Sequence, residues 1–214
     1  MYTQITVIDN PLAQHYLTIL RDKNTKPMIF REALRRLGFI LGYEAAKHLR
    51  WRRVFVETPL AKAEGVKPSK PLLIVGVLGA GIPLIEGMWE ALPWAGLGLV
   101  AARRREDLAE GVEVDIYYQR LPDDLSPFTI ILADPMLATG KTLVGVIKKL
   151  RFRGARDIIV TTVVSSKQGI NHLMRNAGEL PLITIAIDPI LNSKYFIVPG
   201  LGDAGDRGLG YDLY

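Results

Sequence analysis

Cysteine is absent from all 214 positions of the sequence, which excludes disulfide bonds, catalytic thiols and thiolate-bound metals together. Long apolar runs are absent too. The longest stretch without a charged residue, 71–85, has 15 residues and contains two prolines and three glycines. A membrane-spanning helix needs about 20 apolar residues, so we expect no membrane span. The sequence also starts without the basic, apolar and small-residue pattern of an export signal, and we expect a cytoplasmic protein.

The remaining composition is that of a chain that folds. Apolar residues make up 49% of it and charged residues 23%, with 20 glycines and 13 prolines. The length predicts one domain with a sizeable core. Because 27 Lys and Arg stand against 22 Asp and Glu, the net charge is +5. A positive charge favours an anionic partner, without choosing between phosphorylated metabolites, nucleic acid and mere solubility.

Apolar runs without polar alternation predict a parallel sheet. Such runs fit strands that helices cover on both faces, and helical patterns at 83–91, 142–152 and 169–177 lie between them. The sequence therefore predicts an α/β fold with a mainly parallel, twisted sheet. The runs that predict its strands are 72–77, 98–102, 128–133, 158–164 and 182–187.

The remaining segments predict additions to this sheet. Pro11 and Pro27 each precede a helical pattern, since proline suits the first position of a helix. Valines between residues 54 and 66 predict a small hairpin outside the main sheet. The segment 112–119 alternates and predicts an exposed hairpin arm.

Ligands of open α/β sheets bind beyond the carboxyl ends of the strands. After Ala133 the sequence 134–142 reads D-P-M-L-A-T-G-K-T and leads into a helix, whose unpaired N–H groups and positive dipole end predict an anion site. A plain turn in which Asp134 and Thr139 only cap the helix is the alternative. A nucleoside-triphosphate P-loop is disfavoured because Pro135 stands where that motif needs glycine.

Residues 134–142 resemble the phosphoribosyl pyrophosphate (PRPP) signature of type I phosphoribosyltransferases. The form D-P-M-L-A-T-G, with a single Asp134 after Ala133, is that of the uracil phosphoribosyltransferases. Similar stretches cover most of the chain in the family's order: P-L at 11–12, His15, F-R-E at 30–32, L-G-Y-E at 41–44, Y-Q-R-L-P at 118–122 and P-G-L-G-D-A-G-D at 199–206.

This resemblance implies transfer of the phosphoribosyl group of PRPP to N1 of uracil, with Mg²⁺, giving uridine monophosphate (UMP) and pyrophosphate. It implies the type I phosphoribosyltransferase fold with a protruding β-hairpin arm and a C-terminal base-binding hood. The single domain 1–214 then divides into N-terminal helices and a small hairpin (1–70), a PRPP-binding core (71–190) and a uracil-binding hood (191–214). A homodimer or homotetramer acting on small molecules is implied, with no nucleic acid or membrane partner.

The resemblance also assigns site residues. Asp203 is placed beside Mg²⁺, indirectly through PRPP or water. The residues 112–121 resemble a hairpin that covers the substrate, although Tyr117 and Tyr118 there are equally well interpreted as packing residues. The uracil contacts are Ile197, Gly202, Asp203 and Ala204, and the PRPP contacts are Arg104, Asp134, Pro135, Met136, Leu137, Ala138, Thr139, Gly140, Lys141, Thr142 and Asp203.

Composition alone interprets the glycine-rich segment 199–210 as a flexible tail. Against this, the apolar segment 195–198 and Pro199 predict a strand that leads into an ordered turn. Uracil presents acceptor, donor and acceptor groups in a row, and main-chain amides and a carbonyl can match that row where small residues let the backbone approach.

One loop departs from the family pattern. The family usually has an arginine that reaches pyrophosphate where this chain has Gly79. Because losing one donor aimed at developing charge costs about 10²- to 10³-fold in rate, we expect Lys141 or Arg103 to replace part of the missing charge. We align Arg104 by spacing with the family's PRPP-binding arginine.

Two alternatives remain open. Arg31, Glu32, Arg35 and Arg36 form either an allosteric GTP site, as the resemblance suggests, or a solvated helix face. The whole chain is either the enzyme described above, a phosphoribosyltransferase for another nucleobase, or a phosphoribosyltransferase-like regulator that binds nucleotide or RNA with little catalysis. The intact run 197–206 favours the uracil enzyme over the regulator.

Overall fold

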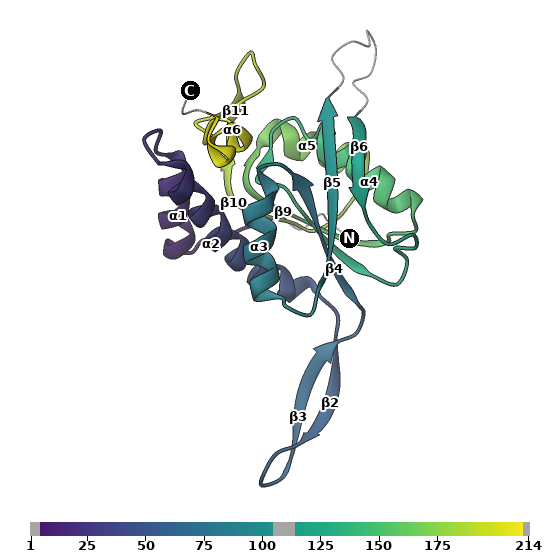
Figure 1. The fold of residues 1–214 in the computed structure, drawn as a ribbon. Helices are drawn as coiled ribbons and strands as arrows, with labels where there is room; N and C mark the ends of the chain where they lie inside the picture. Colours follow the sequence, from purple (N-terminus) through teal and green to yellow (C-terminus); the bar gives the residue numbers. More distant parts are fainter. Residues whose placement is uncertain (1–4, 105–113, 212–214) are drawn as a thin grey trace.

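A computed structural model describes residues 5–104 and 114–211 of the chain (Figure 1). The central sheet has eight strands. They are β1 (Ile5–Val7), β4 (Leu72–Leu78), β5 (Gly96–Arg104), β6 (Val114–Arg120), β7 (Thr129–Ala133), β8 (Met136–Leu137), β9 (Asp157–Ser166) and β10 (Leu182–Asp188). The five apolar runs of the sequence correspond to β4, β5, β7, β9 and β10.

The strand order is β1-β10-β9-β7-β4-β5-β6, and β8 adds to β9 off this path. Every neighbouring pair is parallel except β5 and β6, which are antiparallel. The predicted α/β class with a mainly parallel sheet is therefore confirmed. The carboxyl ends of the parallel strands gather at one edge of the sheet, where the ligand loops were expected.

Helices cover both faces of the sheet. On one face lie α1 (Pro11–Arg21), α2 (Pro27–Ala45) and α3 (Gly81–Ala91), and on the other lie α4 (Lys141–Phe152) and α5 (Lys167–Ala177). A short 3₁₀ turn, Ala46–His48, follows α2. The predicted start of α1 has a clear cause: Asn10 Oδ1 accepts a hydrogen bond from the amide of Leu12 at 2.9 Å, and Pro11 takes the first helical position.

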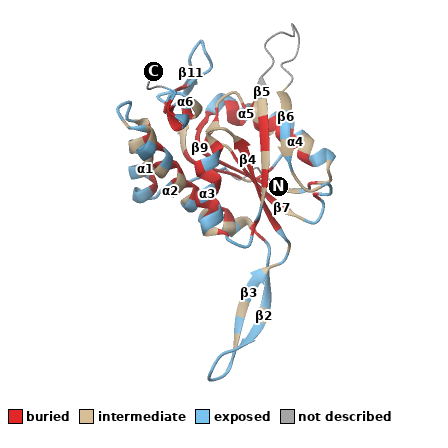
Figure 2. Cartoon of the chain, viewed as in Figure 1, coloured by how far each residue is buried: buried red, intermediate tan, exposed pale blue. Residues whose placement is uncertain are grey.

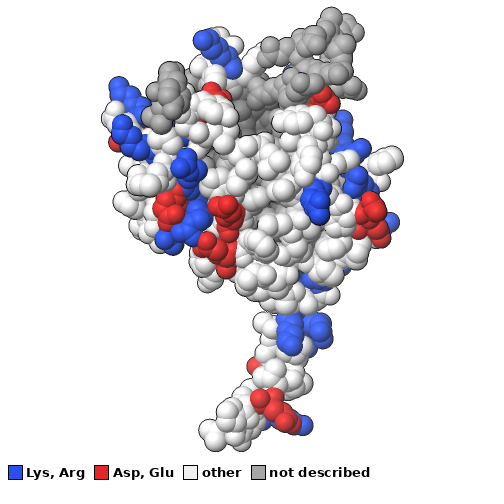
Figure 3. Space-filling model, viewed as in Figure 1, with Lys and Arg blue, Asp and Glu red and all other residues white. Residues whose placement is uncertain are grey.

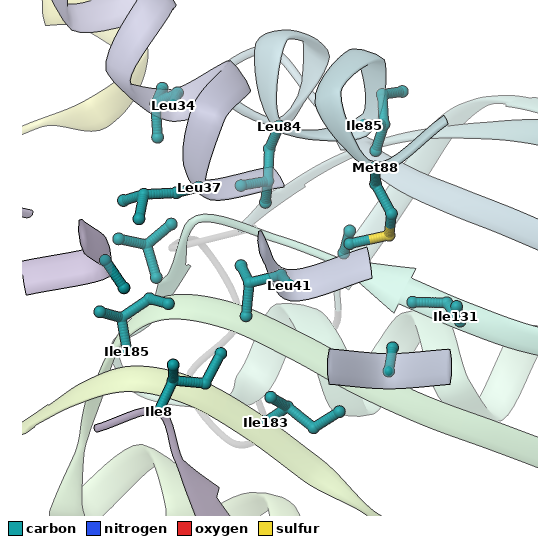
Figure 4. Packing of buried hydrophobic residues seen from close by; sticks show 14 of the residues in the cluster. Ile8, Leu34, Leu37, Leu41, Leu84, Ile85, Met88, Ile131, Ile183 and Ile185 are labelled. Carbon is teal, nitrogen blue, oxygen red and sulfur yellow. The ribbon is translucent and has the colours of Figure 1, made fainter. Parts of the chain in front are cut away.

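The apolar stripe of α2 is the centre of the first layer. Phe30, Leu34, Leu37 and Leu41 are all fully buried. Figure 4 shows the leucines of α2 between side chains of α3, such as Leu84, and isoleucines of the sheet. Burying each such side chain stabilises the fold by about 1.5–3 kcal/mol, which is why the threefold and fourfold spacing of these residues marks a helix.

The sequence predicted two hairpin segments, and they differ in whether they belong to the main sheet. β2 (Trp51–Glu57) and β3 (Lys62–Pro68) pair only with each other, project from the body and are largely exposed, as predicted for a hairpin outside the main sheet (Figure 2). The segment predicted as an exposed hairpin arm, 112–119, contains most of β6, which pairs antiparallel with β5 at the edge of the main sheet and is intermediate to exposed along its length. Residues 112 and 113 of that segment lie outside the described residues.

The C-terminal segment is ordered. β11 (Ile190–Leu191) pairs with β12 (Ile197–Val198), a cis Val198–Pro199 bond follows, and α6 (Ala204–Leu209) begins five residues after Pro199. The flexible-tail interpretation is thus wrong, although the sequence did not predict α6. In the described parts of the chain, each helix is too short or too polar to cross a lipid bilayer.

Candidate active site

A cleft of about 590 Å³ opens at the carboxyl edge of the sheet. Of the four loops that the sequence selected, those after β4, β7 and β10 contribute to its lining, together with Ala102 of β5 and Tyr117 of β6. The loop after β5 lies outside the described residues. The lining residues are Val77, Leu78, Gly79, Ala80, Ala102, Tyr117, Asp134, Met136, Ala138, Thr142, Lys194, Tyr195, Phe196, Ile197, Gly202, Asp203, Ala204, Gly205, Asp206 and Leu209. Residues far apart in the sequence therefore meet at one cavity.

The phosphate loop, residues 134–142, joins β7 to α4. Its first part continues as the short strand β8, in which Met136 and Leu137 pair with β9. Asp134 Oδ1 accepts a hydrogen bond from the amide of Met136 at 3.1 Å. Its carboxylate thus closes a turn at the start of the loop, while Gly140 is the N-cap of α4.

The start of α4 has no side-chain cap. Gly140 is its N-cap, in a left-handed conformation (φ +79°) that favours glycine. Thr139 Oγ1 lies 3.5 Å from the amide of Lys141, at the limit of a hydrogen bond. The first amides of α4 and the positive end of its dipole thus form an anion site of the kind that the sequence predicts.

A small cavity of about 20 Å³ lies within the phosphate loop. This volume suits a single water-sized group, such as one phosphoryl oxygen. Only the loop and the first turn of α4 line it: Met136, Leu137, Ala138, Thr139, Gly140, Thr142 and Leu143.

The hood brings the predicted uracil residues to the same cleft. Asp203 caps α6, since its Oδ1 accepts from the amides of Gly205 at 2.8 Å and Asp206 at 3.0 Å. Ile197 and Ala204 are buried, and Gly202 has a φ of +77°. The structure therefore places all four predicted uracil residues on one wall.

Arginines that the sequence analysis missed hold this wall in place. Arg21 donates to both carboxylate oxygens of Asp188, at 2.9 and 2.8 Å, and to the carbonyl of Gly200 at 3.0 Å. The amide of Gly200 donates to the same Asp188 at 2.8 Å. Arg31, predicted for GTP, donates to the carbonyl of Gly208 at 2.9 Å.

Arg207 is the third arginine that holds the hood in place, and it belongs to the hood itself. It is 9% exposed and lies 4.5 Å over the ring of Phe30. Its guanidinium donates to the carbonyls of Leu201 and Asp22, both at 2.6 Å, and to that of Leu20. A charged residue in a run of glycines and apolar residues was the only sequence signal for this buried role.

The positively charged side chains at the cleft only partly match those that the sequence analysis expected there. Gly79 follows a cis peptide bond, and a Cβ built on it has one neighbour within 4 Å, Leu209 Cδ1 at 3.6 Å. Arg103 and Arg104 lie on β5, but their side chains are outside the described part of the structure. Lys194, which the sequence analysis did not select, lines the cleft. Lys141 is half-buried at the start of α4.

Lys141 also affects a neighbouring histidine. Burial lowers the pKa of His172 on α5, and the positive charges of Lys141 and Lys148 lower it further. No base role was predicted for this histidine.

The tyrosines of β6 are exposed, Tyr117 by 63% and Tyr118 by 45%, so the packing interpretation is wrong, and Tyr117 lines the cleft.

The residues predicted for GTP lie beside a second groove, of about 430 Å³, between α2 and α3. Arg35 donates to Glu32 at 2.8 Å and pairs with Glu90, and Arg36 donates to Glu32 at 2.7 Å. The hydrogen bonds from Arg35 and Arg36 lower the pKa of Glu32. Charges of both signs therefore gather over these helices (Figure 3), which fits the solvated-face interpretation.

Solved structures share this fold. A protein from Aquifex aeolicus, described as AQ2163, has a TM-score of 0.88 and 29% identity, with 99% of this chain and 100% of that chain covered. An adenine phosphoribosyltransferase from Trypanosoma brucei has a TM-score of 0.53 and 14% identity, covering 85% and 82%. A hypoxanthine phosphoribosyltransferase from Staphylococcus aureus gives 0.52 and 14%, covering 75% and 76%. The fold and the phosphate loop define a type I phosphoribosyltransferase.

Sequence relatives narrow the class. The family model of uracil phosphoribosyltransferase matches residues 7–210. A uracil phosphoribosyltransferase from Pyrobaculum arsenaticum is 46% identical over 95% of this chain and 97% of its own. One from Aeropyrum pernix is 43% identical over 95% of both. The chain belongs to the uracil phosphoribosyltransferase family, whose members are transferases of the glycosyltransferase type.

Proposed function

We propose that this chain transfers the phosphoribosyl group of PRPP to N1 of uracil, giving UMP and pyrophosphate. The observation that carries the proposal is that the phosphate loop and the glycine-rich hood line one cleft. The family model and the relatives described above are those of uracil phosphoribosyltransferases, not of a regulator. The regulator is therefore not favoured.

Breaking the bond between the sugar and pyrophosphate builds positive charge on the ribose ring and negative charge on the leaving group. Such a reaction needs placement and anion stabilisation more than a nucleophile. The amides of residues 136–142 hold the 5′-phosphate, and the open end of α4 supports this role. Asp134 accepts hydrogen bonds from ribose hydroxyls and faces the electron-poor ring. Arg104 contributes charge from β5.

The hood recognises uracil through its main chain. Ile197, Gly202 and Ala204 supply the amides and carbonyl that match uracil, and Asp203 lies beside them. Cytosine reverses two of these groups and would leave buried polar groups unpaired, which can reject it by about 10⁴-fold or more.

Magnesium fits the donors of this cleft. Asp134, Asp203 and Asp206 all line it. Among the described residues, no group of three or more His, Asp or Glu is arranged to hold a metal by itself. This agrees with Mg²⁺, which usually binds through one or two carboxylates together with substrate phosphates and water. Asp203 would hold the ion indirectly, and the bound ion would neutralise charge on the departing pyrophosphate.

The parts of the chain divide these tasks in the proposal. Residues 71–190 bind PRPP, 191–214 bind uracil, and 1–70 support both. PRPP is highly charged and does not cross membranes, so we place the reaction in the cytoplasm, where such phosphate esters are made.

We include a homodimer or homotetramer in the proposal. An isolated two-stranded hairpin is marginally stable in water, yet β2 and β3 project from the body with Phe55 74%, Val66 61% and Leu60 97% exposed. Contact with a second copy would cover these side chains. Sedimentation of the wild type and of Phe55→Ser tests this contact.

GTP activation is the least supported part of the proposal. The groove beside Arg31 and Arg35 is large enough for part of a nucleotide, and Arg31 connects it to the hood. A triphosphate there has to compete with Glu32 and Glu90 for Arg35. A rise in turnover on adding GTP, lost in Arg31→Ala, is the expected result.

A product assay tests the reaction itself. The protein is mixed with PRPP and Mg²⁺ and with each of uracil, cytosine, hypoxanthine and orotate. We expect a mononucleotide from uracil alone. A product from another base instead of uracil would assign a different substrate. No product from any base, together with salt-sensitive RNA binding, would replace the enzyme by the regulator.

A further inference from the structure

The back of the phosphate loop lies against the first turn of α5, and Ser166 connects the two. Ser166 is fully buried at the end of β9. Its hydroxyl donates to the carbonyl oxygen of Ala138 at 2.5 Å and accepts from the amide of Gly169 at 2.8 Å. One side chain thus caps α5 and binds the loop at the same time.

The backbone of α5 also presses directly on the loop. A Cβ at Gly169 would lie 2.2 Å from the carbonyl oxygen of Ala138 and 2.7 Å from that of Leu137. Only glycine permits this approach. The positive end of the α5 dipole therefore faces two carbonyl oxygens of the loop, which favours their orientation toward α5.

This orientation determines where the next amide points. In a trans peptide group the C=O and the N–H lie in one plane and point in opposite directions. Because Ser166 holds the carbonyl of Ala138 toward α5, the amide of Thr139 points away from α5. The 20 Å³ cavity, whose lining comes from the loop and α4, lies beside these same residues.

The two helix starts near the loop therefore have different partners. The start of α5 is capped by Ser166 and faces protein carbonyls. The start of α4 has no side-chain cap at Gly140. The amides at the start of α5 therefore have partners within the protein, whereas those at the start of α4 are left for a ligand.

We propose that Ser166 is a positioning residue for phosphate binding: its hydroxyl fixes the Ala138–Thr139 peptide so that the Thr139 amide is aimed at the 5′-phosphate of PRPP and of UMP. This inference rests on the proposed function, because it names the phosphate that the loop receives. It adds a buried residue that does not touch the substrate.

The test compares ligands that use different parts of the cleft. In Ser166→Ala, we expect the KM for PRPP and the Kd for ribose 5-phosphate to rise about tenfold, the effect of about one hydrogen bond to a charged group. The Kd for pyrophosphate and the KM for uracil should stay unchanged. Ser166→Thr keeps the hydroxyl and should restore ribose 5-phosphate binding.

Ser165→Ala is the matched control. Ser165 is equally buried and neighbouring, but its hydroxyl contacts Thr162 at 2.7 Å and Thr184 at 3.2 Å. It should lose stability without a selective loss of ribose 5-phosphate. If Ser166→Ala does not fold, Ser166→Cys replaces the hydroxyl by a thiol, a weak donor that still fills the space, and the same selective loss is expected.

The outcomes separate this inference from the proposed function. Wild-type protein that makes UMP, together with unchanged ribose 5-phosphate binding in Ser166→Ala, would overturn the inference alone. So would an equal loss of ribose 5-phosphate and pyrophosphate, or the same selective loss in Ser165→Ala. Wild-type protein that makes no UMP, but binds ribose 5-phosphate in a way that depends on Ser166, would overturn the proposed function and support the positioning role.

Discussion

The phosphate loop and the hood line one cleft, but different interactions hold them. The loop is held by close backbone contacts with β9 and α5, which follow α4 in the sequence within about 40 residues of the loop. The hood is held by the side chains of Arg21, Arg31 and Arg207, which join it to α1 and α2 across 167 residues or more. We infer that the loop responds to added volume and that the hood responds to lost charge.

The largest effect is expected from adding volume at the loop. In Gly169→Ala the new methyl would overlap the Ala138 carbonyl, 2.2 Å from the built Cβ, and displace the loop. A displacement of about 1 Å can cost about 10²-fold, so we expect kcat/KM for PRPP to fall by about 100-fold. Steady-state kinetics measure it. Gly65→Ala on β3, whose Cβ would meet only Val54 at 3.9 Å, should change nothing.

A smaller effect is expected from removing charge at the hood. In Asp188→Ala, Arg21 loses its two hydrogen bonds to the carboxylate and the amide of Gly200 loses its acceptor. Because Asp188 is 7% exposed but Arg21 is 25% exposed, we expect a stability loss of about 2 kcal/mol and a rise in the KM for uracil of about tenfold. Urea unfolding and kinetics measure these quantities. An unchanged uracil KM would contradict the role of this ion pair.

A positive charge can also be added at residue 79, where the family usually has an arginine. Among the described residues, Leu209 Cδ1 at 3.6 Å is the one neighbour of a Cβ at residue 79, so Gly79→Arg meets no clash at its Cβ. We expect kcat/KM for PRPP to rise about tenfold, part of the 10²- to 10³-fold value of one donor. Gly79→Gln is the uncharged control. Equal kinetics for the arginine and glutamine variants would show that charge at residue 79 is not limiting.

The smallest effect is expected from Lys141→Ala. If Lys141 replaces part of the missing charge, the KM for PRPP rises about threefold, the value of a partly exposed charge contact. The pKa of His172 should also rise, because Lys141 is one of the charges that lower it. An NMR titration of His172 measures this shift. Lys148→Ala should also raise the pKa of His172 but, being further along α4, should leave the KM for PRPP unchanged. An unchanged KM would exclude compensation by Lys141.

The lowered pKa of His172 also predicts how the stability of the fold changes with pH. The pKa of His172 is lower in the folded chain than its usual value of 6.5, so the unfolded chain binds more protons between these two values. Stability should therefore fall as the pH drops below about 6.5. In Lys141→Ala this fall should be smaller, which thermal unfolding at several pH values measures.

Sequence reasoning succeeded where a pattern is local. Runs buried on both faces marked β4, β7 and β9, and the Asn10-Pro11 pair marked the start of α1. It failed where an interaction depends on the main chain of a distant segment. Neither α6 nor β8 was predicted, because both depend on contacts of short segments with neighbours already in place.

The same distinction between local patterns and distant interactions applies to the residues of the site. The phosphate loop and the glycines of the hood were found because anion binding and close backbone approach require particular residue types at fixed spacing. Ser166, Asp188 and Arg207 were not found. They bind backbone groups, and a backbone group has the same chemistry at every position of the chain.

The sequence by itself thus determined the class of fold, the strand that ends at Asp134 and the loop that follows it, since hydrophobic periodicity and turn chemistry act over a few residues. The tertiary structure decided which arginines hold the hood, which serine faces the loop and which helix start stays open for a ligand. These depend on distances between segments up to 187 residues apart, and such distances exist only once the core has brought the layers together.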